Sequence, residues 1–137
     1  MKKLIMILIL LTFVGCNDLN PQIQINNQTN KSLLELHNQE RNIPLKLDSQ
    51  LSIEAQKWAD KMARSNWVRH SNMNMIPYKY KGENIAAGQF TSEEVMKDWI
   101  SSQGHYENIT STDYTHVGFG KSINRKGKTF WCAMFGG

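Results

Sequence analysis

Two histidines and one glutamate in the middle of the chain are the residues best suited to chemistry. His70 and His105 carry imidazoles, which change charge near neutral pH, so each could bind a metal ion, donate to a polar head group, or hydrogen-bond across a cleft. Glu83 follows Gly82, and a carboxylate there could touch a ligand or, equally, orient a neighbouring histidine and accept backbone amides. What these groups do together depends on the fold that positions them.

Several other chemistries lack their sequence motifs. Ser71 stands beside His70 without the glycine-flanked turn that exposes a nucleophilic serine, and Cys132 falls inside an apolar run typical of a strand. The sequence has no glycine-rich phosphate loop, paired-cysteine zinc motif or acidic calcium loop. These features argue against nucleophilic catalysis, nucleotide binding and structural zinc.

The composition indicates one modest globular domain. The 137 residues are 40% hydrophobic and 20% charged, which suffices for one core and is too short for two domains. The net charge is +4, but Lys2 and Lys3 supply half of it, and no basic stripe or arginine cluster runs through the aromatic residues. We therefore expect no nucleic acid among the partners.

The N-terminus has the form of an export signal. Lys2 and Lys3 precede an apolar stretch over residues 4–11 that is too short to span a bilayer. Residues 11–16, LTFVGC, resemble a bacterial lipobox, in which the cysteine is diacylated and becomes the new N-terminus. We expect residues 1–15 to be a lipoprotein-type signal peptide and Cys16 to anchor the exported protein to a membrane, facing the periplasm or the exterior. The alternative is a secreted soluble protein in which Cys16 pairs with Cys132.

Residues 16–30 predict a polar tether that begins at the lipidated Cys16. They are rich in Asn and Gln and have no apolar face, although Ile23 and Ile25 could form a short edge strand. The globular domain is expected over residues 31–137.

Helices are expected first in this domain and a hairpin last. The periodicity and the capping residues predict a helix over 31–42, a second that begins after Asp48 or Ser49, a third after the capping box Thr91–Glu94, and two strands over 117–123 and 129–135 joined by a turn at 124–127. Trp58, Trp99, Phe130, Trp131 and Phe135 lie at helix or strand spacing and are expected in the core. This order favours an α+β fold.

A series of short motifs resembles one known family. The motifs are H-N-x-x-R at 37–41, A-Q-x-W-A at 55–59, H-S at 70–71, G-E-N-I-A at 82–86, W-x-x-S-x-G-H-x-x-N-I at 99–109, and G-F-G at 118–120 followed by F-W-C-x-x-F-G. Their order and spacing resemble the CAP superfamily of cysteine-rich secretory, antigen 5 and pathogenesis-related 1 proteins, also called SCP or TAPS, in its short bacterial form. The resemblance covers residues 31–137 and implies a three-layer α-β-α sandwich with a C-terminal antiparallel hairpin.

The resemblance also implies a cleft lined by two histidines and two glutamates. His70 and His105 match the histidines, and Glu83 matches the glutamate of the G-E-N motif. The second glutamate of typical members falls where this chain has Ser102, so the fourth cleft position is not acidic. His37 also matches a family motif, but on the first helix we expect it to satisfy buried polar groups.

His116 adds a further imidazole where many bacterial relatives carry glutamate. If its side chain points into the cleft, it could complete a set with His70, Glu83 and His105 that suits Zn²⁺. If Val117 and Phe119 face the core instead, His116 points the other way.

Three functions remain open on this sequence. The first is an exported, lipid-anchored CAP-domain module that binds a lipid, a sterol-like molecule or another cell-envelope component and requires no cofactor. The second is hydrolysis of an envelope polymer or peptide, with Zn²⁺ or Mg²⁺ on His70 and His105 and with Glu83 as general base. The third is a surface interaction protein whose cleft is inert, and no oligomeric state follows from the sequence.

Overall fold

The computed structural model describes residues 21–137, which fold into four α-helices, a short 3₁₀ helix and four strands. The elements are α1 (Pro21–Gln39), β1 (Lys46–Leu47), α2 (Ser49–Ser65), η1 (Met73–Met75), β2 (Lys81–Ala87), α3 (Ser92–Ser101), α4 (Gln103–Thr110), β3 (His116–Ile123) and β4 (Thr129–Gly136). The predicted signal peptide and Cys16 lie outside the described residues, so both stay predictions.

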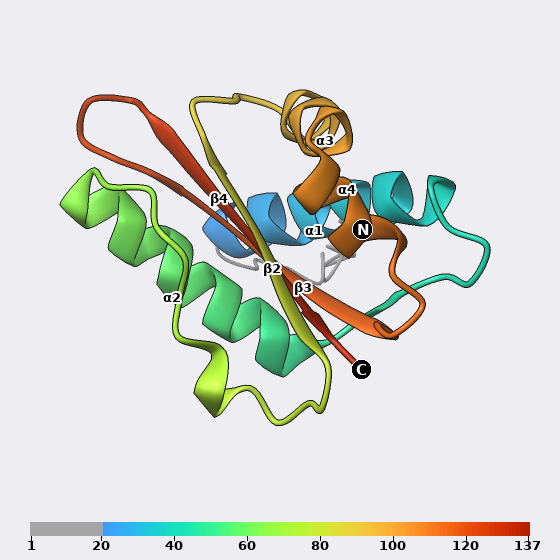
Figure 1. Ribbon diagram of the computed structural model, residues 1–137. Coiled ribbons are helices and arrows are strands. Elements are labelled where there is room, and N and C mark those ends of the chain that lie inside the picture. Colours follow the sequence, from blue (N-terminus) through green and yellow to red (C-terminus); the bar gives the residue numbers. More distant parts are fainter. Residues whose placement is uncertain (1–20) are drawn as a thin grey trace, which may run out of the picture.

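A mixed four-stranded sheet forms the middle layer (Figure 1), with the strand order β1-β3-β4-β2. The strands β3 and β4 pair as an antiparallel hairpin, β2 adds antiparallel to β4, and β1 adds parallel to β3. This order leaves β2 at one edge of the sheet.

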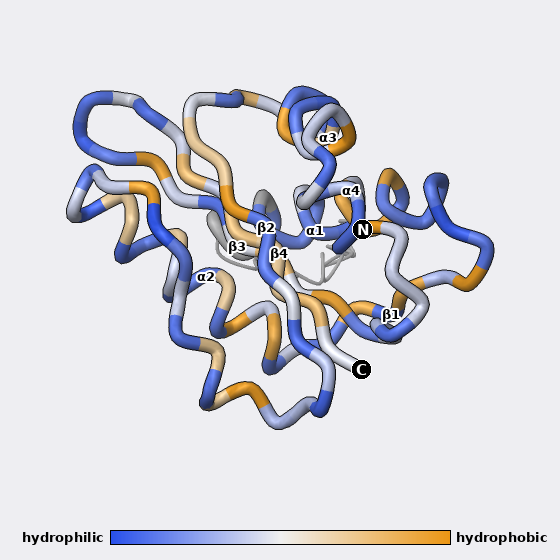
Figure 2. Tube along the Cα trace, viewed as in Figure 1, coloured by the Kyte–Doolittle hydropathy of each residue, from blue (hydrophilic) through white to orange (hydrophobic). Residues whose placement is uncertain are grey.

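Alternating side chains of the strands divide the core between the two faces of the sheet. On one face Phe119, Trp131 and Phe135 cluster with α1, α3 and α4, and on the other Phe130, Cys132 and Met134 cluster with α2. Apolar positions run through the strands, whereas hydrophilic ones dominate the turn between β3 and β4 (Figure 2). The predicted α+β class and α-β-α sandwich are confirmed.

The helix α2 touches the backbone of β3 directly. A Cβ atom at Gly118 would lie 2.1 Å from the backbone nitrogen of Ser52, and one at Gly120 would lie 2.4 Å from the backbone oxygen of Ala55. Gln56 extends this contact, because its side chain accepts from the Lys121 amide and donates to the Lys121 carbonyl. The G-F-G motif therefore serves the close approach of a helix to the sheet.

Each polar residue of the H-N-x-x-R motif has a structural role. His37 is fully buried, and its Nδ1 donates to the Leu33 carbonyl at 2.8 Å. Asn38 both donates to and accepts from the backbone of Leu45. Arg41 donates to the carbonyls of Ile109 and Ser111 at 2.7 Å, where α4 ends with unpaired carbonyls. The motif thus ties the end of α1 to β1 and α4.

The predicted caps and hairpin are found in the structure. Asp48 caps α2, the capping box of Thr91 and Glu94 is complete, and β3 and β4 match the predicted strands within one residue at each end. Of the five aromatic residues expected in the core, all but Trp58 are fully buried. Trp58 is half-buried because its indole N–H reaches the Arg69 carbonyl, 2.8 Å away.

The first helix begins ten residues earlier than the sequence pattern predicted. Residues 21–30 are helical, so Ile23 and Ile25 do not form an edge strand, and the polar tether over 16–30 stays a prediction. Pro21 suits the first position of a helix, and the polar side chains described over residues 24–30 are exposed or half-buried on it. The polarity of this segment therefore indicated exposure, not an extended conformation.

We expect Gly118→Ala to destabilise the protein strongly. The new methyl group would collide with backbone atoms of α2, and backbone cannot rotate away as a flexible side chain can. Overpacking typically costs about 1–3 kcal/mol, and we expect the upper end of that range in the free energy of unfolding because the clash is with backbone. Gly104→Ala is the matched control, because its Cβ would meet nothing within 4 Å. Equal urea midpoints for the two variants would contradict the proposed contact.

We also expect His37 to make the fold sensitive to acid. Burial lowers the pKa of His37 from 6.5 to about 4, so the unfolded chain takes up a proton between these pH values and the folded chain does not. Stability is therefore complete above pH 6.5 and falls as the pH drops toward 4, by about 3 kcal/mol in total.

The measurement is urea unfolding across this pH range for the wild type and for His37→Met. The variant should lose less stability over the window, because only the His37 contribution is removed while the carboxylates titrate in both proteins. Parallel stability curves for the two proteins would refute this role.

Candidate functional site

Glu83 is the buried centre of the candidate site. The register places it on the α2 face of β2, opposite Met134, and its side chain is 4% exposed. Its Oε1 accepts from the backbone N–H of Ser71 at 2.9 Å and from His70 Nδ1 at 2.7 Å. Its Oε2 lies 3.7 Å from the Cys132 thiol. A buried carboxylate needs such donors, and here a loop supplies them.

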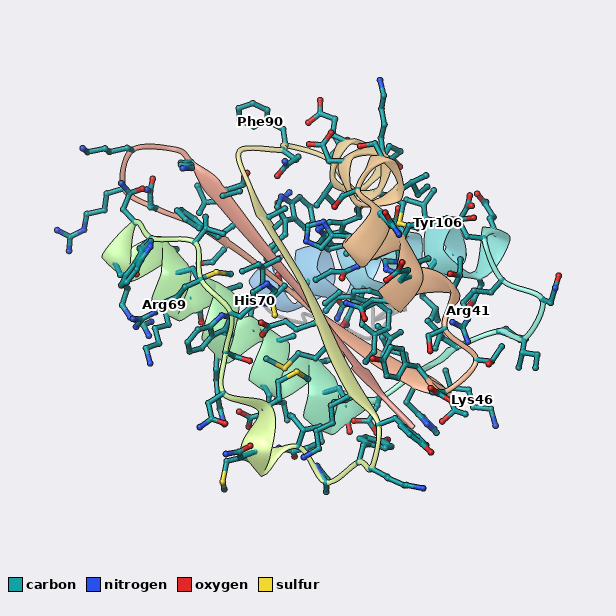
Figure 3. All side chains as sticks on the ribbon, viewed as in Figure 1. Arg41, Lys46, Arg69, His70, Phe90 and Tyr106 are labelled. Atoms are coloured by element: carbon teal, nitrogen blue, oxygen red, sulfur yellow. The ribbon has the colours of Figure 1, made fainter. Side chains whose placement is uncertain are left out.

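The segment after α2 carries His70 to this carboxylate. Asn66 adopts a left-handed conformation (φ 50°) at the end of α2 and turns the chain back. Trp58 then holds the segment against α2 through its bond to the Arg69 carbonyl. The His70 ring is oriented by Glu83 and is still 64% exposed (Figure 3). The Nδ1 side of the His70 ring is therefore fixed by Glu83, and the rest of the exposed ring is open to a ligand.

Burial and charge perturb two further groups, Cys132 and His105. Burial raises the pKa of the Cys132 thiol, and the Glu83 carboxylate raises it further, so this cysteine is held as a neutral thiol. Burial also lowers the pKa of His105, and the charge of His70 lowers it further. The two imidazoles are thus electrostatic neighbours, and the neutral form of His105 is favoured.

Asn84 holds the opposite side of the site. It is the next residue of β2 and faces the other layer, where its Nδ2 donates to the His105 carbonyl at 2.9 Å and its Oδ1 accepts from Asn108 at 2.9 Å. Because neighbouring strand residues face opposite sides, Glu83 holds the His70 loop while Asn84 holds α4. The edge strand β2 therefore positions both histidines.

Side chains also cover the outer carbonyls of β2. Tyr114 donates to the Lys81 carbonyl, Asn108 to the Glu83 carbonyl, and the Trp99 indole to the Ile85 carbonyl. This edge is thus occupied on its carbonyl side by α3, α4 and the segment before β3. The sequence did not reveal the positioning roles of Asn84, Asn108 and Tyr114, although both asparagines stand inside the G-E-N-I-A and G-H-x-x-N-I motifs.

Two of the predicted site residues, Ser102 and His116, make no hydrogen bond to Glu83 within the described residues. Ser102 joins α3 to α4, and its side chain makes no capping hydrogen bond. His116 bonds to Thr115 through Nδ1, and its ring centroid is 5.7 Å from that of Tyr78, whose hydroxyl bonds to Asp48. The structure joins His70 to Glu83 and places His105 within the electrostatic influence of His70, whereas His116 has different neighbours.

The cleft does not fit a catalytic zinc ion with three protein ligands. Within the part of the chain that the structure describes, no three His, Cys, Asp or Glu side chains form a group that could hold a metal. Both oxygens of Glu83 already face donors, which leaves the two imidazoles. Catalytic zinc sites use three protein ligands and a water, and two histidines fall short of that.

Comparison with known proteins agrees with this geometry. A profile of the cysteine-rich secretory protein family, CAP, matches residues 34–135. The chain belongs to the CAP family. Its motifs therefore lie on the sandwich that their resemblance implied, with serine at position 102.

Relatives of this CAP-domain chain include the uncharacterized protein YkwD of Bacillus subtilis, which is 38% identical in an alignment that covers 66% of this chain and 41% of YkwD. Among solved structures, an extracellular SCP-domain protein of Bacillus anthracis has a TM-score of 0.69 at 24% identity, covering 85% of this chain and 43% of its own. An outer surface protein of Borrelia burgdorferi has a TM-score of 0.66 at 19% identity, with coverages of 86% and 95%. The matches span less than half of the two Bacillus proteins, and the structural likenesses establish the fold.

We expect His70→Gln to raise the pKa of His105. The substitution keeps a polar side chain of similar size and removes a charge that lowers this pKa. The measurement is an NMR titration of the His105 imidazole, with His116→Ala as the control because His116 lies against Tyr78. An unchanged His105 pKa in His70→Gln would mean that the two rings do not interact.

Proposed function

We propose that this protein is an exported binding module that takes the polar head group of a lipid or another cell-envelope component between His70 and His105. The observation that carries the proposal is the bond from His70 Nδ1 to the buried Glu83 carboxylate. The buried acid orients an exposed imidazole, so the ring's other nitrogen, Nε2, is held ready for a partner outside the domain. Glu83 itself serves as the positioning residue.

His105 complements His70 in this role. Its lowered pKa favours the neutral ring, which can accept as well as donate a hydrogen bond, and it has no side-chain hydrogen bond within residues 21–137. A hydroxyl or phosphate group between the two rings would meet a donor on one side and an acceptor on the other. The pair therefore suits a polar head group.

Export is supported by the sequence and by the relatives. Residues 1–15 have the form of a signal peptide and Cys16 that of a lipid attachment site. The Bacillus anthracis relative is described as extracellular and the Borrelia one as an outer surface protein. No described helix is long and apolar enough to cross a membrane. We propose that the lipid on Cys16 holds the domain at a membrane surface.

Binding is favoured over metal-dependent hydrolysis by the state of Glu83. A general base must face the water that it activates, whereas Glu83 is buried and accepts from His70 and Ser71. The described residues also offer no third ligand beside the two histidines. An interaction protein with an inert cleft remains the competing function, and the following experiment separates the two.

We expect head-group probes to shift the imidazole NMR signals of His70 and His105. The probes are glycerol 3-phosphate, N-acetylglucosamine and micelles of lysophosphatidylglycerol, added to the full chain. The signals of His116 should not move, because it lies against Tyr78, and this makes it an internal control. His70→Gln combined with His105→Gln should abolish binding while the unfolding midpoint stays near that of the wild type.

Two outcomes would overturn the proposal. If none of the probes moves the two signals, the cleft is inert toward head groups and the interaction protein is favoured. If only Zn²⁺ moves them, with micromolar or tighter affinity, the imidazole pair is a metal site.

A further inference from the structure

A basic hollow lies on the protein outside the histidine cleft. It has a volume of about 570 Å³ and lies between the end of α2 and the turn that joins β3 to β4. Arg64, Arg125 and Lys126 line it, and a hydrogen bond of 3.0 Å between Asn124 and Asn66 joins its two sides. The turn is therefore fastened to the helix end, and the three cations share one surface.

Within residues 21–137 these three cations have no side-chain partner. None of them forms an ion pair or a side-chain hydrogen bond with another described residue. The hollow contains one acid, Asp60, whose Oδ1 accepts from Gln56. The excess positive charge is thus available to an anionic partner.

Exposed apolar side chains lie on the two chain segments that form the hollow. Ile123 lines it and is 60% exposed, and Trp67, one residue from Asn66, is 59% exposed. Val68 is also exposed. The guanidinium of Arg69 lies 4.8 Å from the Trp67 ring centroid, so a further cation stands against this exposed aromatic ring. We call Arg64, Trp67, Val68, Ile123, Arg125 and Lys126 the basic turn face.

We infer that the basic turn face is a membrane contact that lies on anionic phospholipid. Unpaired cations suit lipid phosphates, and tryptophan beside aliphatic side chains suits the head-group boundary of a bilayer. A soluble polyanion would use the cations but would leave Trp67, Val68 and Ile123 in water. The combination of charge and apolar exposure therefore selects the membrane over the polymer.

The N-terminal side of the domain supports this orientation. In Figure 1 the blue start of α1 lies toward the same end of the sandwich as the end of α2 and the β3–β4 turn. The predicted lipid-bearing Cys16 precedes Pro21 by five residues. The lipid anchor on Cys16 and the basic turn face can then contact the same bilayer. His70 directly follows Arg69 in the chain. The inference does not depend on a ligand in the histidine cleft.

The test places the full chain on vesicles that contain brominated acyl chains, which quench tryptophan inside the bilayer. The vesicles consist of phosphatidylcholine with or without phosphatidylglycerol. On the anionic vesicles we expect part of the tryptophan fluorescence to be quenched, and this quenched part to be missing in Trp67→Phe. It should disappear in the triple variant Arg64→Glu, Arg125→Glu, Lys126→Glu, and weaken as salt is added.

The matched control is the triple variant Lys46→Glu, Lys79→Glu, Lys97→Glu, which changes the net charge equally at exposed lysines outside the basic turn face and should keep the quenching. Three results would overturn the inference: no Trp67 quenching on anionic vesicles, equal quenching on neutral ones, or equal loss in the control variant. Binding of soluble polyphosphate that depends on Arg64, without quenching on vesicles, would assign the surface to a polymer.

Discussion

The contact between α2 and the glycines of β3 is the constraint on which the rest of the structure depends. With hydrogen at positions 118 and 120, the helix lies on the strand backbone, and Gln56 fastens it there. The position of α2 then decides where its last turn releases the chain, and so where His70 meets β2. A side chain at either glycine would lift the helix and move the His70 loop away from Glu83.

The edge strand β2 carries the two residues that position the histidines of the candidate site. Glu83 and Asn84 are adjacent, so their side chains enter opposite layers, one reaching the loop after α2 and the other reaching α4. Each is buried and polar, and each is stable there only because donors or acceptors surround it. The two histidines are therefore held by the hydrogen-bonding needs of two buried residues, which is a more rigid arrangement than two exposed loops would provide.

Under the two proposals, the two surfaces of this CAP domain divide recognition between them. The cleft presents two imidazoles, one of them oriented by a buried acid, and suits a single polar group. The basic turn face presents unpaired cations beside exposed Trp67 and Ile123, and suits an extended anionic surface. A domain held at a membrane by such a face would have its cleft close to head groups, and local concentration would compensate for modest affinity in the cleft.

By itself the sequence determined the family, the α+β class, the cap of α2, the capping box of α3 and the C-terminal hairpin, because these depend on neighbours a few residues apart. It did not predict β2, because the buried polar residues at 83 and 84 hide the alternating strand pattern. It also placed the start of α1 ten residues late, because polar residues suit an exposed helix as well as a tether. Only the tertiary structure decided that His70 bonds to Glu83 while His116 lies against Tyr78, and that Arg64 shares a hollow with Arg125. Those pairings depend on strand register and helix packing between segments far apart in the chain, which spacing along the sequence does not encode.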